Sequence, residues 1–241
     1  MKIQVAYCSI FQLSHELFIN NYFAHLLLNG VMKLQVAFDL ESSNDILNFV
    51  ENNGDLIDIV EVGTPLIMKE GLNSVQKIKK KFPKQTVLAD MKIMDAGLLE
   101  AQIGFDAGAD IITVLGLASK KTLGSVKQTA VKNSKEVMVD MINQPYPEKK
   151  WNELMNMEMG LCCLHTANDD TKDGETPLND LERFYNLHGS KNIAVAGGIN
   201  PDLIRKINIF HPEIVIVGGY ITNSRNYRDA LEEIHKAMDS R

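Results

Sequence analysis

The chain has 241 residues, of which 45% are hydrophobic and 23% are charged, and its formal net charge is -6. This composition is that of an ordinary globular protein, and it excludes disordered, collagen-like and low-complexity chains. Basic residues form no extended patch, so we expect no nucleic-acid partner. The densest basic group, Lys77 to Lys81, is interpreted as the solvent face of a helix.

Residues 1–31 differ in composition from the rest of the chain. They contain five aromatic residues but only two charged ones, Lys2 and Glu16. Polar residues interrupt their apolar stretches, which predicts neither a secretory signal nor a membrane span. We expect residues 1–31 to be an extension outside the fold, translated from a start codon placed too early, and residues 32–241 to form one catalytic domain. The three cysteines lack disulfide or metal-site spacing, which favours a cytoplasmic location.

From Lys33 onward, short runs rich in Val and Ile alternate with longer segments of helical periodicity. The predicted strands are 34–39, 57–62, 86–91, 110–115, 136–142, 161–165, 193–196 and 213–217. Most are apolar on both faces, as expected for a parallel sheet that helices cover. Eight such units in roughly 205 residues predict a single (β/α)8 barrel, also called a TIM barrel. A doubly wound sheet is the alternative, but no GxGxxG motif follows the first strand.

Local signals also predict where helices begin and end. Ser42 and Asp45 have the spacing of a capping box, so the first helix is predicted to begin at Ser42 and to stop at Gly54. Pro201 is predicted in the first turn of the seventh helix, where its missing N–H has little effect.

Polar residues and glycines stand where the predicted strands end. The active site of a (β/α)8 barrel lies at the C-terminal ends of its strands, so these residues are candidates for one site. They are Asp39, Glu61, Asp90, Lys92, Asp95, His165 and the pairs Gly197-Gly198 and Gly218-Gly219. One carboxylate at such a position is commonly a helix cap, but several together favour a functional site.

Lys92 is flanked in the sequence by Asp90 and Asp95. Alternate residues of a strand face the same side, so Asp90 and Lys92 are both predicted to face the barrel interior. Acidic neighbours would keep a buried lysine charged, and its ammonium could stabilise an oxyanion that forms on a bound sugar phosphate. The alternative is an ion pair that only holds the barrel together, although such pairs contribute little stability.

Glu61 and Asp90 end neighbouring strands, and their carboxylates suit Mg²⁺; the alternative is that Glu61 is an ion-pair partner of Lys92. A lone histidine is often a core residue, but at the barrel mouth His165 could accept and return a proton. A single Gly-Gly pair is usually a turn. Two pairs after consecutive strands favour phosphate binding through backbone N–H groups.

These residues, in this order, resemble the orotidine-monophosphate-decarboxylase-like barrel superfamily and, within it, the 3-hexulose-6-phosphate synthase family. The resemblance covers residues 32 to about 222. It rests on the stretches LQVAFDL, DIVEVGTPLIMKEG, VLADMKIMDAG, AGADIITVLG, VDMI, HT at His165, AVAGGI and IVIVGG.

The resemblance implies Mg²⁺-assisted aldol chemistry, in which ribulose 5-phosphate loses a C1 proton and the enediolate attacks formaldehyde to give 3-hexulose 6-phosphate. It implies that Glu61 and Asp90 bind the metal, that Lys92 stabilises the enediolate and that His165 transfers the proton. It assigns the sugar hydroxyls to Asp39 and the phosphate to Gly197, Gly198, Gly218 and Gly219. It also implies a homodimer in which Asp95 enters the neighbouring subunit's site.

Three segments depart from this family's pattern: residues 167–172 after His165-Thr166, residues 143–151, and Tyr220. These differences are compatible with three other activities. One is the similar 3-keto-L-gulonate-6-phosphate decarboxylase, although Thr166 favours the synthase. A metal-free nucleotide decarboxylase would leave Glu61 without a metal role. A catalytically silent phosphosugar-binding barrel would not need the charged group around Lys92.

Overall fold

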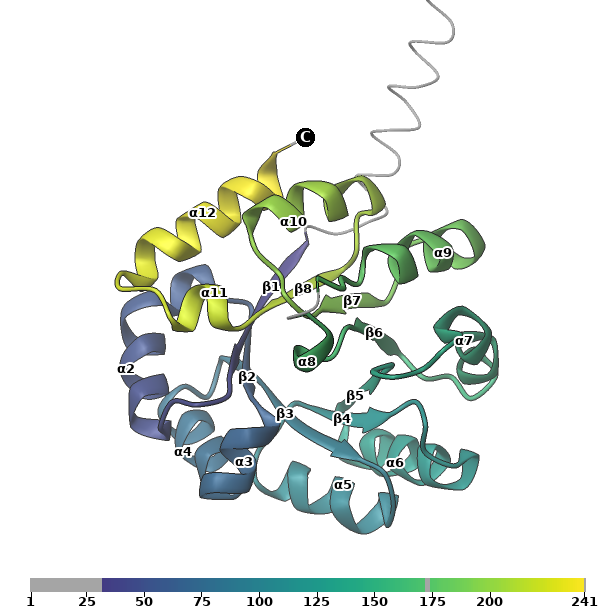
Figure 1. Cartoon of the computed structure of the whole chain (residues 1–241). Helices are drawn as coiled ribbons and strands as arrows, with labels where there is room; N and C mark the ends of the chain where they lie inside the picture. The colour runs from purple at the N-terminus through teal and green to yellow at the C-terminus, as the bar shows by residue number, and fades with distance from the viewer. Residues whose placement is uncertain (1–31, 172–173, 241) are drawn as a thin grey trace, which may run out of the picture. The chain divides into compact units, whose positions relative to one another are not determined.

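Eight parallel strands pair in chain order, and the last strand pairs with the first, which closes the barrel (Figure 1). The structure is a computed structural model that describes residues 32–171 and 174–240. The strands are β1 (Lys33–Phe38), β2 (Ile59–Val62), β3 (Thr86–Ile93), β4 (Ile111–Leu115), β5 (Glu136–Asp140), β6 (Leu161–His165), β7 (Ile193–Ala196) and β8 (Ile214–Val217). The (β/α)8 barrel predicted from the sequence is therefore confirmed.

Helices surround the strands (Figure 1). They are α2 (Ser43–Asn53), α3 (Thr64–Glu70), α4 (Asn73–Lys81), α5 (Gly97–Asp106), α6 (Lys120–Asn133), α7 (Pro147–Met155), α8 (Asn168–Thr171), α9 (Leu178–His188), α10 (Pro201–Ile207), α11 (Gly219–Thr222) and α12 (Tyr227–Asp239), with short 3-10 turns at Gly54–Leu56 and Asn208–Phe210. None of the helices within the described ranges is long and apolar enough to cross a membrane.

The predicted helix signals act as expected. Ser42 caps α2 and forms the full capping box with Asp45, and Gly54 follows the last residue of the helix. Pro201 occupies the first turn of α10. In α4, Lys77, Lys80 and Lys81 are exposed, as expected for the solvent face of a helix.

Two apolar clusters lie on the two faces of the closed sheet. The larger cluster packs the outer face against the helices. The inner cluster fills the barrel with Ala37, Ile59, Leu88, Ile111, Met138, Leu161, Cys163, Ala194, Ala196, Ile214 and Ile216. This arrangement explains why most strands are apolar on both faces. It also leaves the strand ends as the place where polar side chains can gather.

Residues 1–31 lie outside the described residues. Their predicted status as an extension therefore stays a prediction, as does the domain boundary at residue 32.

Candidate active site

A cavity of about 700 Å³ opens at the C-terminal ends of the strands. Nearly all of the site residues predicted from the sequence line it: Asp39, Glu61, Asp90, Lys92, His165, Gly197, Gly198, Gly218 and Gly219. Asp95 is exposed and is not among the lining residues. The strand-end rule thus brings together side chains from distant parts of the chain, with Asp95 as the exception.

Lys92 lies between two carboxylates in this cavity. Its Nζ is 3.1 Å from Oδ2 of Asp90 and 2.5 Å from Oδ2 of Asp140. Burial opposes the charge, but Asp90 and Asp140 outweigh it and raise the pKa of the Lys92 ammonium. The lysine therefore stays a fixed cation at neutral pH. Among the described residues it forms no ion pair with Glu61, so the structure does not support the alternative role of Glu61.

Asp140 is the functional residue that the sequence analysis missed. It is buried at the end of β5, where its carboxylate accepts hydrogen bonds from the ammonium of Lys92 and from the backbone N–H of Ile142, the latter at 2.9 Å. Nδ1 of His165 lies 3.0 Å from the same carboxylate. Burial alone would raise the pKa of Asp140, but His165 and Lys92 lower it to about 2. Asp140 rather than Asp95 is thus the second acid beside Lys92.

His165 ends β6 and is oriented by Asp140. The Asp140 carboxylate contacts Nδ1, so Nε2 is the ring nitrogen left for a substrate. This is the geometry of a general base that a carboxylate holds in position. Its place at the barrel mouth agrees with the predicted role, since a histidine enclosed in the core could not reach a ligand.

The backbone of β3 is irregular at the motif itself. β3 pairs with β4 at Ala89↔Ile112 and again at Ile93↔Val114, so β3 advances four residues while β4 advances two. Within this bulge Lys92 has a positive φ of 46°, which is unusual for a residue with a side chain. The Lys92 N–H donates to Oγ1 of Thr113 at 2.8 Å, and this bond holds the bulge. Strained backbone of this kind is typical of functional sites.

Hydroxyl groups fix the carboxylate of Asp90. Oγ1 of Thr64 donates to Oδ2 and Oγ1 of Thr113 donates to Oδ1, both at 2.7 Å. Each carboxylate oxygen still has a further lone pair for a ligand.

Glu61 lines the same cavity, and Nε2 of Gln35 donates to its Oε2 at 2.5 Å. Burial and the neighbouring charge of Asp90 raise the pKa of Glu61 to about 8. Without a cation, this carboxyl group is therefore largely protonated at neutral pH. A divalent cation beside Glu61 and Asp90 would offset both the burial of Glu61 and its repulsion by Asp90, and would favour the ionised carboxylate. Two carboxylates that line one cavity are a donor set that fits Mg²⁺, which keeps several waters in its shell.

The glycines after β7 and β8 are not equivalent. Gly197 has a φ of 102°, and a Cβ there would lie 2.4 Å from the carbonyl oxygen of Thr166, so only glycine fits. Gly198 also has a positive φ, of 64°. At Gly218 the nearest atom to an added Cβ is 3.6 Å away, so this position has room for a side chain.

Two of the three segments that depart from the family pattern line the cavity, whereas residues 143–151 are not among its lining residues. Residues 168–171 form α8, whose Asn168 and Thr171 line the cavity together with Thr166. Tyr220 also lines it, and its hydroxyl donates to Glu233 of α12. These positions therefore alter the wall of the site rather than a remote surface.

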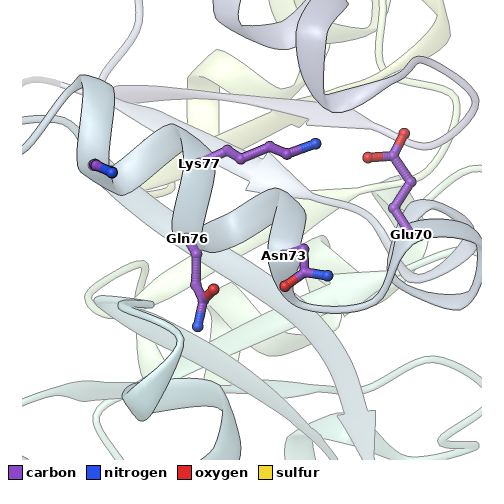
Figure 2. A pocket seen from close by; sticks show the side chains of 5 residues that line it. Glu70, Asn73, Gln76 and Lys77 are labelled. Carbon is purple, nitrogen blue, oxygen red and sulfur yellow. The ribbon is translucent and has the colours of Figure 1, made fainter.

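A second pocket, of about 530 Å³, lies on the outer surface at α3 and α4 and includes none of the predicted site residues. Figure 2 shows Lys77 extending from α4 toward the side where Glu70 projects from the neighbouring segment. Lys77 donates to Oγ of Ser43 at 3.0 Å, and Glu70 accepts the backbone N–H of Ser43. These side chains connect helices, so the pocket is a feature of helix packing.

Comparisons with known proteins identify the family to which the chain belongs. The model of the orotidine 5'-phosphate decarboxylase / HUMPS family matches residues 32–234. The chain belongs to this family. It is 38% identical over 210 residues to 3-hexulose-6-phosphate synthase from Staphylococcus aureus, a match that covers 87% of the chain and 100% of the relative. The chain is therefore an enzyme of the lyase class, as predicted.

Solved structures of the family superpose on the barrel. 3-Hexulose-6-phosphate synthase from Salmonella typhimurium has a TM-score of 0.82 and 36% identity, covering 86% of this chain and 98% of that one. 3-Keto-L-gulonate-6-phosphate decarboxylase from Vibrio cholerae has a TM-score of 0.76 but 22% identity, covering 87% and 98%. The second likeness shows the fold alone.

Proposed function

We propose that the enzyme condenses ribulose 5-phosphate with formaldehyde to give 3-hexulose 6-phosphate, in an Mg²⁺-dependent aldol reaction through an enediolate. The observation that carries this proposal is the ammonium of Lys92, held by Asp90 and Asp140 inside a cavity that also contains His165. The higher identity to synthases than to the decarboxylase supports the same choice.

The side chains divide the reaction between them. Nε2 of His165 takes the C1 proton of ribulose 5-phosphate, and the electron pair of that C–H bond enters the enediolate. The ammonium of Lys92 stabilises the resulting negative charge. C1 then forms a bond to the carbon of formaldehyde, whose oxygen receives the C=O electron pair and takes up a proton from His165. Asp140 keeps both Lys92 and His165 in position during these steps.

The cation would be held by Glu61 and Asp90. When bound, Mg²⁺ would supply Lewis-acid chemistry to oxygens of the sugar. Gln35 keeps Glu61 oriented toward the cavity, and Thr64 and Thr113 do the same for Asp90.

The phosphate of the substrate would lie at the opposite side of the cavity. The loops after β7 and β8 contribute Gly197, Gly198, Gly218 and Gly219, and α11 is a short helix directly after β8. This is the place where (β/α)8 barrels frequently bind phosphate. Asp39, exposed at the end of β1, would accept hydrogen bonds from the sugar hydroxyls.

We also propose that the enzyme is a homodimer in which Asp95 completes the partner's site. Asp95 is outside its own cavity, and α5, which follows it, exposes Leu98, Leu99 and Ile103, at 66%, 59% and 47% of their surfaces. An exposed apolar helix face next to a charged residue is expected at an interface between subunits.

Mixing two inactive variants tests the shared site. In a dimer of one Asp95→Ala chain and one Lys92→Ala chain, a single site has both residues intact. Random reassociation of equal amounts gives one half mixed dimers, so we expect about a quarter of the wild-type activity. Each variant alone is the control and stays inactive. A mixture that remains inactive after proven subunit exchange would contradict the shared site.

The decisive experiment for the reaction combines two assays with Mg²⁺ present. Exchange of the C1 proton of ribulose 5-phosphate in D₂O separates an enzyme from a silent phosphosugar binder. Formaldehyde-dependent formation of hexulose phosphate, against CO₂ release from 3-keto-L-gulonate 6-phosphate, then separates the synthase from the decarboxylase. Exchange without formaldehyde-dependent product would refute the proposed substrate pair.

A further inference from the structure

Two adjacent cysteines in β6 point to opposite faces of the barrel. Cys162 belongs to the outer cluster beneath the helices, whereas Cys163 belongs to the inner cluster and lines the active-site cavity. Both are free thiols. The proposed aldol reaction gives Cys163 no role, so its place beside the charged residues calls for a separate explanation.

Cys163 completes a set of three metal-binding side chains. Its Sγ, a ring nitrogen of His165 and a carboxylate oxygen of Asp140 all lie within 4.8 Å of one another. Thiolate, imidazole and carboxylate are the three ligand types that proteins use for Zn²⁺, at bond lengths of about 2.0–2.3 Å. Tetrahedral ligands at those lengths are about 3.5 Å apart, so the donors need to approach by about 1 Å. Rotation of the Cys163 and His165 side chains can provide this movement.

The charge of the cavity favours an additional cation. Five carboxyl groups line it, those of Asp39, Glu41, Glu61, Asp90 and Asp140, against the single ammonium of Lys92. Burial raises the pKa of the Cys163 thiol, so the thiol is neutral in the cation-free protein and loses its proton when a metal binds.

Ligand softness separates this set from the proposed Mg²⁺ site. Glu61 and Asp90 offer only oxygen, which hard cations prefer, whereas the thiol of Cys163 selects a softer ion.

We propose that Asp140, Cys163 and His165 form a second cation site, for a thiophilic divalent ion such as Zn²⁺, and that its occupation inhibits the enzyme. The ion takes the position between His165 and Asp140 that a proton occupies in their hydrogen bond. It also repels the ammonium of Lys92 from Asp140. The binding stands on the three side chains alone, while the inhibition rests on the proposed function.

Co²⁺ is the probe for binding, because it takes the same ligands as Zn²⁺ and its bond to a thiolate absorbs in the near ultraviolet. The full chain carries Cys8→Ser, since Cys8 lies outside the described residues and its thiol could also bind the ion. We expect the thiolate absorption in this parent and in Cys162→Ala, the neighbouring cysteine on the opposite face. We expect its loss in Cys163→Ala and in the similarly sized Cys163→Ser.

Competition with Zn²⁺ should abolish the absorption. Loss of the thiol should weaken Zn²⁺ binding at least about tenfold, because even residues that only support a metal ligand typically change the affinity by that factor. Circular dichroism confirms that the variants are folded. Absent absorption in the parent, or absorption that persists in both Cys163 variants, would overturn the proposed site.

Inhibition is measured separately with saturating Mg²⁺. Zn²⁺ should inhibit the parent and Cys162→Ala alike, and Cys163→Ala should require at least about tenfold more Zn²⁺ for the same inhibition. Equal Zn²⁺ sensitivity of all variants would overturn the inhibitory role. If the parent binds Co²⁺ but condenses no formaldehyde, the proposed function fails while the cation site stands.

Discussion

Replacing Asp140 by Asn tests whether this carboxylate holds Lys92 and His165 as one unit. The substitution keeps the size of the side chain but removes its charge. The oxygen of the amide can still accept a hydrogen bond. Its NH₂ group cannot accept one, although the groups around this side chain are donors. The ammonium of Lys92 then retains only Asp90, at 3.1 Å, as an acidic partner.

The pKa of Asp140 gives the size of the effect on stability. Its fall from 3.8 to about 2 corresponds to about 2 kcal/mol of stabilisation by the folded surroundings. Because the folded-state pKa is lowered, this stabilisation is fully present above pH 3.8 and is lost as the pH falls toward 2. We therefore expect Asp140→Asn to lower the free energy of unfolding by about 2 kcal/mol at pH 5 to 7, with a smaller difference below about pH 4.

The effect on catalysis should exceed the effect on stability. If Asp140 orients the proton-transferring His165, its loss should lower kcat by about 100-fold or more, the usual range for general acid–base groups. Urea unfolding and the formaldehyde-dependent assay measure the two quantities. A folded variant with unchanged kcat would refute the idea that Lys92 and His165 act through Asp140.

Asp110→Asn is the matching control. Asp110 precedes β4 at the N-terminal end of the barrel and contacts two lysines, Lys79 at 2.5 Å and Lys135 at 2.6 Å. It should lower stability but leave kcat unchanged, because it lies outside the cavity.

Three further substitutions probe the cation, the enediolate and the sugar. Lys92→Ala should abolish C1 proton exchange while binding of inorganic phosphate, followed by calorimetry, remains; retained exchange would exclude its proposed role. Without divalent cations, stability should fall as the pH rises from 4.5 through about 8, because the folded protein keeps a proton on Glu61. Glu61→Gln should remove this pH dependence and weaken Mg²⁺ binding; an unchanged slope in urea unfolding would contradict it. A Cβ at Gly63 would lie 2.0 Å from Oδ1 of Asp39, so Gly63→Ala should displace that carboxylate and raise KM more than it lowers kcat; an unchanged KM would argue against a sugar contact by Asp39.

The barrel was predictable because its signals are local. Most strands are apolar on both faces, as expected for a sheet that is covered on both sides. The capping box at Ser42 fixes where the first helix begins. Most strand boundaries coincide with the prediction, and the others differ from it by one or two residues. Most residues of the site were predictable as well, because residues at the C-terminal ends of the strands of a (β/α)8 barrel meet at one mouth.

Asp140 was not among the predicted site residues because the predicted end of β5 lies two residues too far along the chain. The predicted strand ran to residue 142, which made Asp140 an internal position, whereas the strand ends at Asp140 itself. Pairing with the neighbouring strands decides where a strand ends, and a single sequence does not encode that directly. A usable signal was present: Asp140 is a lone acid in the apolar run VMVDMI, as Asp90 is in VLADMKI.

The remaining features depend on contacts between distant segments. The bulge at Lys92 is held by Thr113 of the next strand, and the need for glycine at Gly197 comes from the carbonyl of Thr166. Asp95 is a different case, because one chain alone does not contain the site that it is predicted to complete. Sequence patterns report which residues lie near a strand end, but not which neighbour will constrain them.

The cavity consists of two halves that differ in the kind of group they offer. From β2 to β6 it carries charged side chains, connected as a chain of contacts in which Thr113 joins Asp90 to the backbone of Lys92 and Asp140 joins Lys92 to His165. The loops after β7 and β8 offer backbone at Gly197 and Gly218 instead. A substrate with a phosphate at one end and a reactive carbonyl at the other matches this division, because backbone N–H groups bind phosphate without altering the charge that the reacting carbon requires.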